Sequence, residues 1–337
     1  MKILISGSFW HGSLEESYAQ AFESIGWTVL RFDWDEFARA HPLARMAYGD
    51  KLLRSRIADR VGKWFVSEIE SRQPDLVFVI KGRYIHPNVL VRTKEILGNR
   101  PLVNFNPDSP WEKTNSSQRL LAAIPNYDLH FTWNSHLKDR FKEASAKSVE
   151  FLPFAYDPAL HQPVSPGLAE RRFDAVFLGT YSAERDKLLS ALVGCNIAIW
   201  GNGWERSKHV PKEWLQGKAV YGAESTRLLD LAPVALNLLR PQNEGSHNMR
   251  TFEIPASRHA MLTTRSEEQS QWFTEGLEME CFSGPEELLE KVRMLRSDRA
   301  KARRIAEAGY ERVCDETYAK RARTMLDVLG FAKNSLP

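Results

Sequence analysis

The stretch "DLVFVI", residues 75–80, places five apolar residues in succession after a single aspartate. A strand with one face in water alternates apolar and polar residues, whereas a strand covered on both faces is apolar throughout. The stretch therefore predicts a buried strand of a parallel sheet. Such a sheet needs helices on both faces, because the crossover between parallel neighbours is usually a helix.

Short apolar runs alternate with amphipathic stretches on both sides of this segment. Upstream, "KILIS" at 2–6 and "TVLRFD" at 28–33 flank a helical stretch that ends at Gly26, a residue favoured just past a helix. A second helical stretch covers 49–72, and the runs "LVNFN" and "LHFTWN" follow downstream. This alternation predicts a doubly wound α/β domain.

A proline-rich segment then interrupts the pattern. Residues 151–172, "FLPFAYDPALHQPVSPGLAERR", contain four prolines and show no clear period, which is typical of a linker. Afterwards the alternation restarts, with "FDAVFLG", "NIAIWG", "VALNLL" and "AMLTT" as strands. We predict an N-terminal Rossmann-like domain at 1–158, a linker at 159–170 and a second Rossmann-like domain at 171–315.

Length and composition agree with two globular domains. The chain has 337 residues, of which 43% are hydrophobic, and this is enough for two cores of ordinary size. A net charge of +3 from 46 basic and 43 acidic residues excludes polyanion binding by bulk charge. The basic run at 301–304 shares its helix with Glu307 and Glu311, so we interpret it as a solvated face and expect no nucleic-acid partner.

The cysteines indicate the compartment. Cys195, Cys281 and Cys314 are widely spaced and form no CxxC motif or zinc pattern, which favours a reducing environment and a protein without a metal site. The sequence also shows no signal-peptide pattern and no long apolar span. We therefore predict a cytoplasmic protein and leave peripheral membrane association open.

Ligands of open α/β sheets bind beyond the carboxyl ends of the strands, and two such ends combine a polar turn with arginine. The first group is Gly179, Thr180 and Arg185, and the second is Asn248, Met249, Arg250 and Thr251. Glycine admits close approach of the backbone, helix-start N–H groups point at an anion, and arginine neutralises it. Together they predict a diphosphate site. The alternative is that Arg185 and Arg250 begin amphipathic helices and face solvent.

Glu253 follows Arg250 within one helical turn and precedes Pro255, which interrupts the helix ladder. A carboxylate there can accept hydrogen bonds from two hydroxyl groups, as recognition of a ribose requires. The alternative is an ion pair with Arg250 across the turn. From the residues alone both interpretations stay open.

The stretch 236–264, "LNLLRPQNEGSHNMRTFEIPASRHAMLTT", resembles the signature segment of the CgeB-like (spore maturation protein B) glycosyltransferases, relatives of the family 4 retaining GT-B transferases. Further stretches are similar to that family in the same order: "PDLVFVIKGRYI", "NFNPDSPW", "YDLHFTWN", "FLPFAYDPALHQP", "FDAVFLGTYSAER", "IAIWGNGW" and "VYGAESTRLLDLAPVALNLLR". The resemblance spans most of the chain. It is strongest from 174 to 264.

This resemblance implies the GT-B fold, in which two Rossmann-like domains with parallel sheets face a central cleft. The helix at 316–337 would complete the first domain. The second domain would bind the nucleotide-sugar donor. Arg185 and the helix start at 248–251 would bind the diphosphate, Glu253 the ribose, and the backbone around Tyr221 the base, while Arg240 would line the same pocket.

The implied reaction is transfer of a sugar, of the hexosyl type, from a nucleotide-diphosphate donor to an acceptor hydroxyl, with retention at the anomeric carbon. It needs no metal ion and no cofactor, because Arg185 and helix-start N–H groups would stabilise the departing diphosphate. The acceptor, a glycan, a lipid-linked glycan or a protein, would enter from the first domain. His11 or Asp108 would orient its hydroxyl, although an aspartate before Ser-Pro is also a common turn former.

Two positions depart from the family pattern. Family 4 enzymes place two glutamates eight positions apart, but Gly245 stands eight positions before Glu253, with Glu244 one step further. Arg258 also occupies a position where a small residue is expected. A nucleotide-sugar epimerase on the same fold and a catalytically inactive relative that acts as a binding protein therefore stay open.

Two other interpretations are disfavoured. Asp33 and Asp35 form a DxD pattern, the metal signature of another transferase fold, but acidic residues are common after the second strand of a Rossmann-like unit. A nicotinamide-dependent oxidoreductase would need GxGxxG after the first strand. The loop "GSFWHG" has bulky Phe9 and Trp10 there instead.

Overall fold

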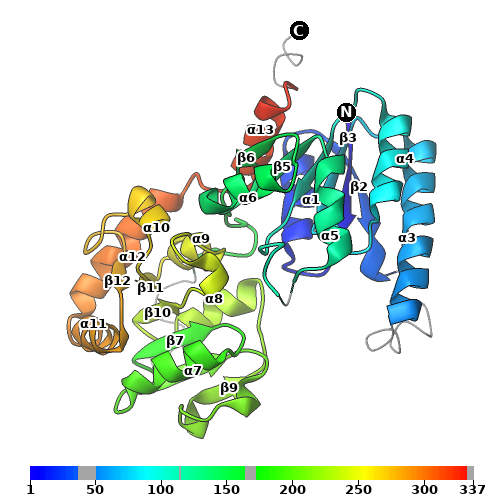
Figure 1. Cartoon of the computed structure of the whole chain (residues 1–337). Coiled ribbons are helices and arrows are strands. Elements are labelled where there is room, and N and C mark those ends of the chain that lie inside the picture. The colour runs from blue at the N-terminus through cyan, green and yellow to red at the C-terminus, as the bar shows by residue number, and fades with distance from the viewer. Residues whose placement is uncertain (37–50, 114, 164–171, 332–337) are drawn as a thin grey trace. The chain divides into compact units, whose positions relative to one another are not determined.

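The structure is a computed structural model that describes residues 1–36, 51–113, 115–163 and 172–331 (Figure 1). Contacts between Cα atoms divide the chain into two compact units. The first unit comprises Met1–Pro153 and Tyr318–Pro337, and the second comprises Phe154–Thr317. Of the predicted linker, 159–163 lie in the second unit and 164–170 fall outside the described residues.

The first unit contains a parallel sheet in the order β2-β1-β3-β4-β5-β6. Its strands are β1 (Lys2–Gly7), β2 (Thr28–Asp33), β3 (Leu76–Ile80), β4 (Leu102–Phe105), β5 (Leu129–Thr132) and β6 (Val149–Phe151). Every residue of β3 is buried, as the apolar run predicts. The connections after β1 and β3 lead to opposite sides, so the switch point of the strand order lies between these two strands.

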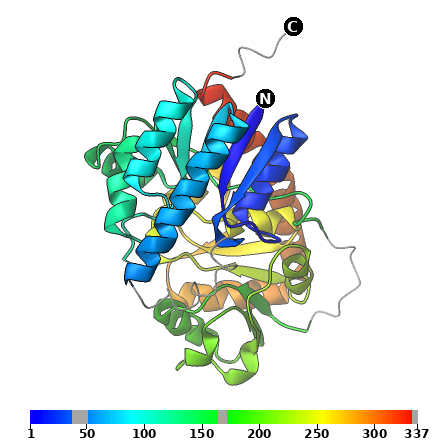
Figure 2. The ribbon, with the colours of Figure 1, turned by 90° about the vertical axis from the view of Figure 1, so that its right-hand side faces the viewer.

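Helices cover this sheet. They are α1 (Leu14–Ser24), α3 (Lys51–Arg72), α4 (Pro87–Leu97), α5 (Gln118–Ala123), α6 (Lys138–Glu143) and α13 (Tyr318–Val328), with short 3-10 turns at Ile124–Asn126 and Ser135–Leu137. The long blue helix α3 packs beside the cyan α4 (Figure 2). The last helix, α13, packs against α1, where the rings of Tyr18 and Tyr318 lie 5.0 Å apart (Figure 1). Residues 332–337 of the predicted C-terminal helix fall outside the described residues.

The second unit contains a parallel sheet in the order β12-β11-β10-β7-β8-β9. Its strands are β7 (Ala175–Leu178), β8 (Ile197–Trp200), β9 (Leu215–Gly217), β10 (Val234–Asn237), β11 (Ala260–Thr264) and β12 (Glu280–Phe282). From β7 the chain proceeds to β8 and β9 on one side, and from β10 it proceeds to β11 and β12 on the other. The switch point therefore lies between β7 and β10.

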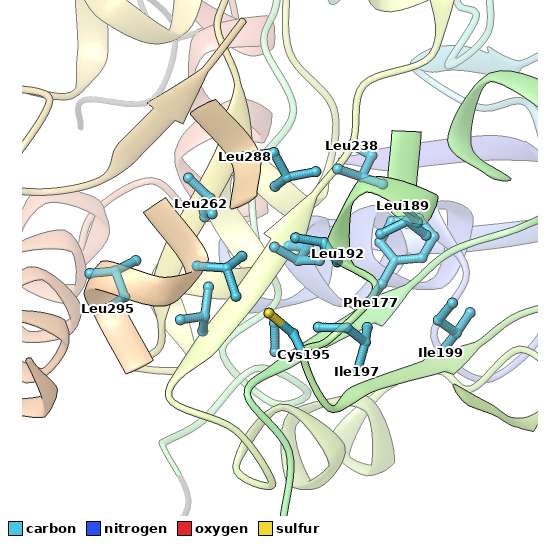
Figure 3. Packing of buried hydrophobic residues seen from close by; sticks show 14 of the residues in the cluster. Phe177, Leu189, Leu192, Cys195, Ile197, Ile199, Leu238, Leu262, Leu288 and Leu295 are labelled. Carbon is cyan, nitrogen blue, oxygen red and sulfur yellow. The ribbon is translucent and has the colours of Figure 1, made fainter. Parts of the chain in front are cut away.

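One apolar cluster joins this sheet to the helices at 183–189, 285–297 and 299–313 (Figure 3). The second unit has several helices. They are α7 (Ala183–Leu189), α8 (Ala223–Leu229), α9 (Arg250–Ala256), α10 (Glu267–Trp272), α11 (Pro285–Ser297) and α12 (Arg299–Val313), with 3-10 turns at Ser190–Leu192, Trp204–Arg206, Lys212–Trp214 and Pro241–Asn243. The cluster joins Phe177 of β7, Leu189 of α7 and Leu288 of α11. It also includes Leu238, just after β10 (Figure 3).

The predicted α/β class with two parallel sheets is confirmed. All nine strands that the apolar runs predict are present. The three that the sequence did not reveal, β6, β9 and β12, have three residues each and lie at sheet edges. A run of three residues is too short to show a period. An edge strand also pairs with a neighbouring strand on one side only.

Candidate functional site

The switch point of the second sheet brings together two loops that are far apart in sequence. Because β7 and β10 are adjacent and parallel, the chain leaves both strands at the same edge of the sheet. The first loop runs from Gly179 to the start of α7, and the second runs from Leu238 to the start of α9. Ligands of doubly wound sheets bind at this kind of position.

Glycine allows the loops after β7 and β8 to touch. A Cβ on Gly201 would lie 1.9 Å from the carbonyl oxygen of Gly179, so no other residue fits at position 201 without a shift of the backbone. The indole Nε1 of Trp204 donates to the same carbonyl at 2.8 Å. The backbone that leads into α7 is therefore held close to the sheet.

Arg185 connects the two loops of the switch point. Its backbone N–H is capped by the Ser182 hydroxyl at 3.3 Å, and its buried side chain turns back across the sheet edge. Nη1 donates to the carbonyl of Thr180 at 3.0 Å, and Nη2 donates to the carbonyl of Leu238. The side chain of Leu238 sits in the apolar cluster (Figure 3), which fixes the carbonyl that receives this bond.

The guanidinium of Arg185 is not neutralised by any carboxylate in contact with it within the described residues. Its Nε is buried without a hydrogen-bond partner in that part of the chain. Burial, together with the positive charges of Arg240 and Arg250, lowers the pKa of Arg185 to about 9. A buried cation beside two others is unfavourable unless an anion joins them.

Of the other two arginines, one has a partner. Arg250 Nη1 lies 2.7 Å from Glu253 Oε2, which bears out the ion pair that the helical spacing suggested. The side chain of Arg240 makes no hydrogen bond or ion pair with the described residues. Three guanidinium groups therefore share one contacting carboxylate, so the site carries excess positive charge.

A polar network supports the start of α9. Asn248 Nδ2 donates to Asn237 Oδ1 at 2.8 Å, and Asn248 Oδ1 accepts from the N–H of Thr251 at 3.2 Å. The Thr251 hydroxyl is buried and donates to Gln269 Oε1 at 3.1 Å. The N–H and hydroxyl of Thr251 are thus used within the protein. The N–H groups of Met249 and Arg250 have no partner among the described residues, so they can meet an anion.

The preceding part of the signature segment is anchored in the interior. His247 is buried, with Nδ1 at 2.9 Å from Glu268 Oε2, and its Nε2 accepts from the N–H of Phe154 at 3.1 Å. Asn243 Nδ2 donates to the carbonyl of His247 at 2.7 Å. Glu244, the candidate for the displaced sugar-side carboxylate, is exposed. These contacts fix the backbone that leads to Arg250.

Tyr221 lies just before α8 and has 47% of its surface exposed. The next residue, Gly222, has a φ of 62°, a conformation that favours glycine. The backbone at 219 is tied to the loop after β8, because Asn202 Oδ1 accepts from the N–H of Ala219 at 3.2 Å. An exposed ring beside an anchored backbone offers a flat face and hydrogen-bonding groups to a ligand.

Comparisons with known proteins agree with this geometry. Residues 185–327 match a family model described as "Glycosyl transferase-like". Sucrose-phosphate synthase from Thermosynechococcus elongatus aligns with a TM-score of 0.68 at 12% identity, over 99% of this chain and 100% of that chain. The chain has the GT-B glycosyltransferase fold.

Two further GT-B structures are similar over nearly the whole chain. HepE of Anabaena in complex with UDP and glucose has a TM-score of 0.63 at 14% identity, over 98% of this chain and 99% of that chain. T4 phage β-glucosyltransferase has a TM-score of 0.60 at 12% identity, over 97% and 99%. No curated protein matches the sequence. The matched family segment contains all three arginines of the site, so this part of the GT-B chain is glycosyltransferase-like in sequence.

The first unit of this GT-B chain carries different chemistry at its own switch point. Glu15, in the first turn of α1, is buried against Gly7, where a Cβ would lie 2.2 Å from Glu15 Cγ. Glu15 Oε1 accepts weakly from the N–H of Ser8 at 3.4 Å. Burial raises the pKa of the Glu15 carboxyl, and its own backbone N–H and the nearby Lys81 partly offset this rise. Asp33, by contrast, accepts from the N–H groups of Asp35 and Glu36 and closes a turn.

The predicted acceptor residues lie at the same edge of the first sheet. Asp108 pairs with Lys81 at 3.2 Å, and its N–H donates to Asn106 Oδ1 at 3.1 Å, so it both forms a turn and carries a paired charge. His11 is exposed on the loop after β1. Both belong to the first unit, whereas the predicted donor residues all belong to the second.

Two residues at these sites were not predicted from the sequence. His161 lies inside the predicted linker, yet its Nε2 is 3.7 Å from Glu253 Oε1. Its place in the family-like stretch "FLPFAYDPALHQP" was the available signal. The sequence contained no signal for Glu15, because a glutamate in the first turn of an amphipathic helix usually faces solvent.

Neither a metal site nor a membrane span is found in the parts of the chain that the structure describes. In those ranges no three His, Cys, Asp or Glu side chains cluster in a way that would hold a metal ion. No helix there has the length and hydropathy needed to cross a bilayer.

Proposed function

We propose that the chain is a glycosyltransferase that moves a sugar from a nucleoside-diphosphate sugar to an acceptor hydroxyl. One observation carries the proposal: three arginines with one contacting carboxylate converge at the switch point of the second sheet. A diphosphate supplies the negative charge that this arrangement lacks. The family match over 185–327 and the UDP in the HepE structure support a nucleoside diphosphate as the source of that charge.

Each donor-site residue then has a role. Arg185 and the N–H groups of Met249 and Arg250 bind the diphosphate, and Arg240 supplies a further positive charge. Glu253 accepts hydrogen bonds from the ribose hydroxyls, since its carboxylate retains lone pairs beyond the Arg250 contact. Tyr221 and the adjoining backbone contact the base.

The chemistry follows from where charge develops. The bond from the anomeric carbon to the diphosphate oxygen breaks, the acceptor oxygen bonds to that carbon, and the acceptor proton leaves with the diphosphate. Arg185 is catalytic in this proposal because it stabilises the charge that builds on the leaving group, which makes a metal ion unnecessary. Departure and attack on the same face give retention, and Asp108 or His11 of the first unit orients the acceptor hydroxyl.

The finer identity is also part of the proposal. We place the chain among CgeB-like enzymes that transfer a hexose to a glycan, a lipid-linked glycan or a protein. Three unpaired cysteines, Cys195, Cys281 and Cys314, support a cytoplasmic location, where thiols stay reduced. Peripheral membrane association would suit a lipid-linked acceptor.

The exposed position of Glu244 favours a second candidate. With Gly245 in place of the sugar-side glutamate and Glu244 turned to solvent, the chain lacks the usual carboxylate for the sugar. A catalytically inactive relative would keep the diphosphate site and bind the nucleotide without turnover. An epimerase would instead convert the nucleotide-sugar without any acceptor.

Calorimetry and product analysis test these alternatives together. Full-length protein is titrated with UDP, GDP, ADP, TDP, CMP and NAD, first without divalent metal and then with Mn²⁺. We expect one nucleoside diphosphate to bind without metal. NMR of the nucleotide-sugar then distinguishes transfer or slow hydrolysis with retention from epimerisation and from no turnover. Binding of NAD alone, or of none of these ligands, would rule out the proposed function.

A further inference from the structure

His161 lies beside the carboxylate that we assign to the ribose. The two side chains are both buried, and His161 Nε2 is 3.7 Å from Glu253 Oε1. On the other side of the carboxylate, Oε2 contacts Arg250 Nη1 at 2.7 Å. Each oxygen of Glu253 therefore faces one nitrogen-bearing side chain, and the carboxylate has little freedom to rotate.

The backbone fixes the orientation of the imidazole. His161 Nδ1 lies 3.3 Å from the Asp157 nitrogen, whose N–H it can accept, and 3.2 Å from the Asp157 carbonyl oxygen, to which it can donate. The same carbonyl accepts from the backbone N–H of His161 at 2.9 Å. Both contacts hold the ring in place, and the Glu253 carboxylate favours the tautomer with the hydrogen on Nε2, the nitrogen that faces it, so that Nδ1 accepts from the Asp157 N–H. At 3.7 Å the contact with Glu253 is electrostatic rather than a hydrogen bond.

We propose that His161 is a positioning residue that holds the Glu253 carboxylate in the orientation that receives the ribose hydroxyls. The inference rests on the proposed function and goes beyond it, because it assigns the preference for ribonucleotides over deoxyribonucleotides to a residue outside the signature segment. Arg250 alone would let the carboxylate pivot about the Oε2 contact. His161 removes that pivot by facing the other oxygen.

The segment that carries His161 is held by contacts that do not involve the imidazole. Asp157 Oδ1 accepts from the N–H of Ala159 at 2.9 Å, and the Asp157 carbonyl accepts from the N–H of Leu160 at 3.1 Å. The hydroxyl of Thr226 in α8 donates to the carbonyl of Leu160 at 3.4 Å. Replacement of the ring should therefore leave the segment in place, and the effect of His161 on Glu253 can be measured separately.

The test compares three probes: UDP, 2′-deoxy-UDP and inorganic pyrophosphate. Should the panel select another base, the matching ribose and deoxyribose pair is used. Calorimetry gives the ratio of the dissociation constants for the deoxy and ribo forms. Wild type should bind 2′-deoxy-UDP about tenfold more weakly, as expected for one charged hydrogen bond lost. Glu253→Ala removes both acceptor oxygens and should bring the ratio close to one.

His161→Ala should lower this ratio about threefold while the affinity for pyrophosphate stays within about twofold of wild type. His161→Gln retains an N–H donor and should recover at least half of the discrimination. His259→Gln is the matched control, because His259 is also buried in the second unit and faces a carboxylate, Asp230, at 3.5 Å. It should leave all three affinities unchanged.

The outcomes separate the two proposals. A wild-type ratio that persists in His161→Ala but collapses in Glu253→Ala would overturn the role of His161 and leave the proposed function standing. Equal weakening of pyrophosphate and UDP in His161→Ala would show a structural role instead, and would also overturn the inference. If no nucleoside diphosphate binds wild type, both proposals fail.

Discussion

The switch points of the two sheets have the same architecture but different electrostatics. In the second unit, the loops after β7 and β10 place Arg185 beside Arg240 and Arg250, with Glu253 as the one contacting carboxylate among the described residues. In the first unit, the loops after β1 and β3 place a buried Glu15 near Lys81, and Lys81 is already paired with Asp108. The edge of the second sheet therefore has an excess of positive charge, whereas the lysine at the edge of the first sheet is paired with a carboxylate.

This difference shows that the fold supplies the location of a site and side chains supply its chemistry. Both sheets are parallel and doubly wound, so both offer loops at the carboxyl ends of their strands. A net cationic edge attracts a diphosphate. An edge that carries a buried acid and a paired lysine has no such excess of positive charge.

The largest expected effect comes from removal of the central cation. Arg185→Ala should weaken binding of the selected nucleoside diphosphate about 100-fold, or about 2.8 kcal/mol, because a buried charged hydrogen-bond donor is lost. Arg185→Lys keeps the charge but cannot bridge the carbonyls of Thr180 and Leu238, so it should lose about tenfold. Calorimetry measures both, and thermal unfolding checks that each variant folds.

Arg265→Ala serves as the control for these variants. Arg265 pairs with Glu275 and Glu287 in the same unit and contributes nothing to the proposed site, so the nucleotide affinity should not change. A dissociation constant for Arg185→Ala within about threefold of wild type would show that the cationic edge is not the anion site, since a charged hydrogen bond is worth more than that.

Removal of Arg240 should have a smaller effect. Its side chain is partly exposed and makes no hydrogen bond or ion pair within the described residues, so Arg240→Ala should cost about tenfold in affinity and little stability. Exposed charges are screened by salt. The dependence of the dissociation constant on salt concentration should therefore be shallower in the variant. An unchanged slope would place Arg240 outside the pocket.

The buried acid of the first unit should appear in the pH dependence of stability. Burial raises the pKa of Glu15, so the folded chain binds more protons than the unfolded chain between the two pKa values, and stability falls as pH rises through that window. Glu15→Gln has no carboxyl group at this position, so it does not lose stability over that window. It should be about 1 kcal/mol more stable than wild type near pH 7. The difference should vanish below about pH 4.

Denaturant unfolding of wild type and Glu15→Gln across that pH range measures the difference. Glu16→Gln on the same helix is the control, because Glu16 pairs with Arg31 at the surface, at 3.1 Å. Removal of a surface ion pair should change the unfolding free energy by about 0.5 kcal/mol or less. A Glu15→Gln variant less stable than wild type at pH 7 would mean that Lys81 and the backbone N–H groups stabilise the charge on Glu15 by more than its burial costs.

The smallest effect is expected at the paired charges of the first unit. Lys81 and Asp108 are partly exposed, so Lys81→Ala should change the unfolding free energy by about 0.5 kcal/mol or less. The affinity for the nucleoside diphosphate should stay unchanged, and calorimetry checks this. A loss of nucleotide affinity comparable to that of Arg240→Ala would remove the distinction between the two edges.

The sequence by itself determined most of the secondary structure and the fold class of this protein. Continuous apolar runs such as 76–80 marked the buried central strands, because a strand covered on both faces admits few polar residues. The glycine and arginine turns after "FDAVFLG" and "VALNLL" indicated the edge where we propose the anion site, because parallel strands present their carboxyl ends at one edge. These patterns are local, so they can be recognised without knowing which segments are neighbours in space.

Only the tertiary structure decided which side chains meet across that edge. The bond from Arg185 to the Leu238 carbonyl joins residues 53 positions apart, and it depends on β7 and β10 being neighbours. The burial of Glu15 depends on a glycine in β1, and the approach of His161 to Glu253 depends on how the predicted linker packs. Strand order and packing fix such contacts, and no periodicity along one chain encodes them.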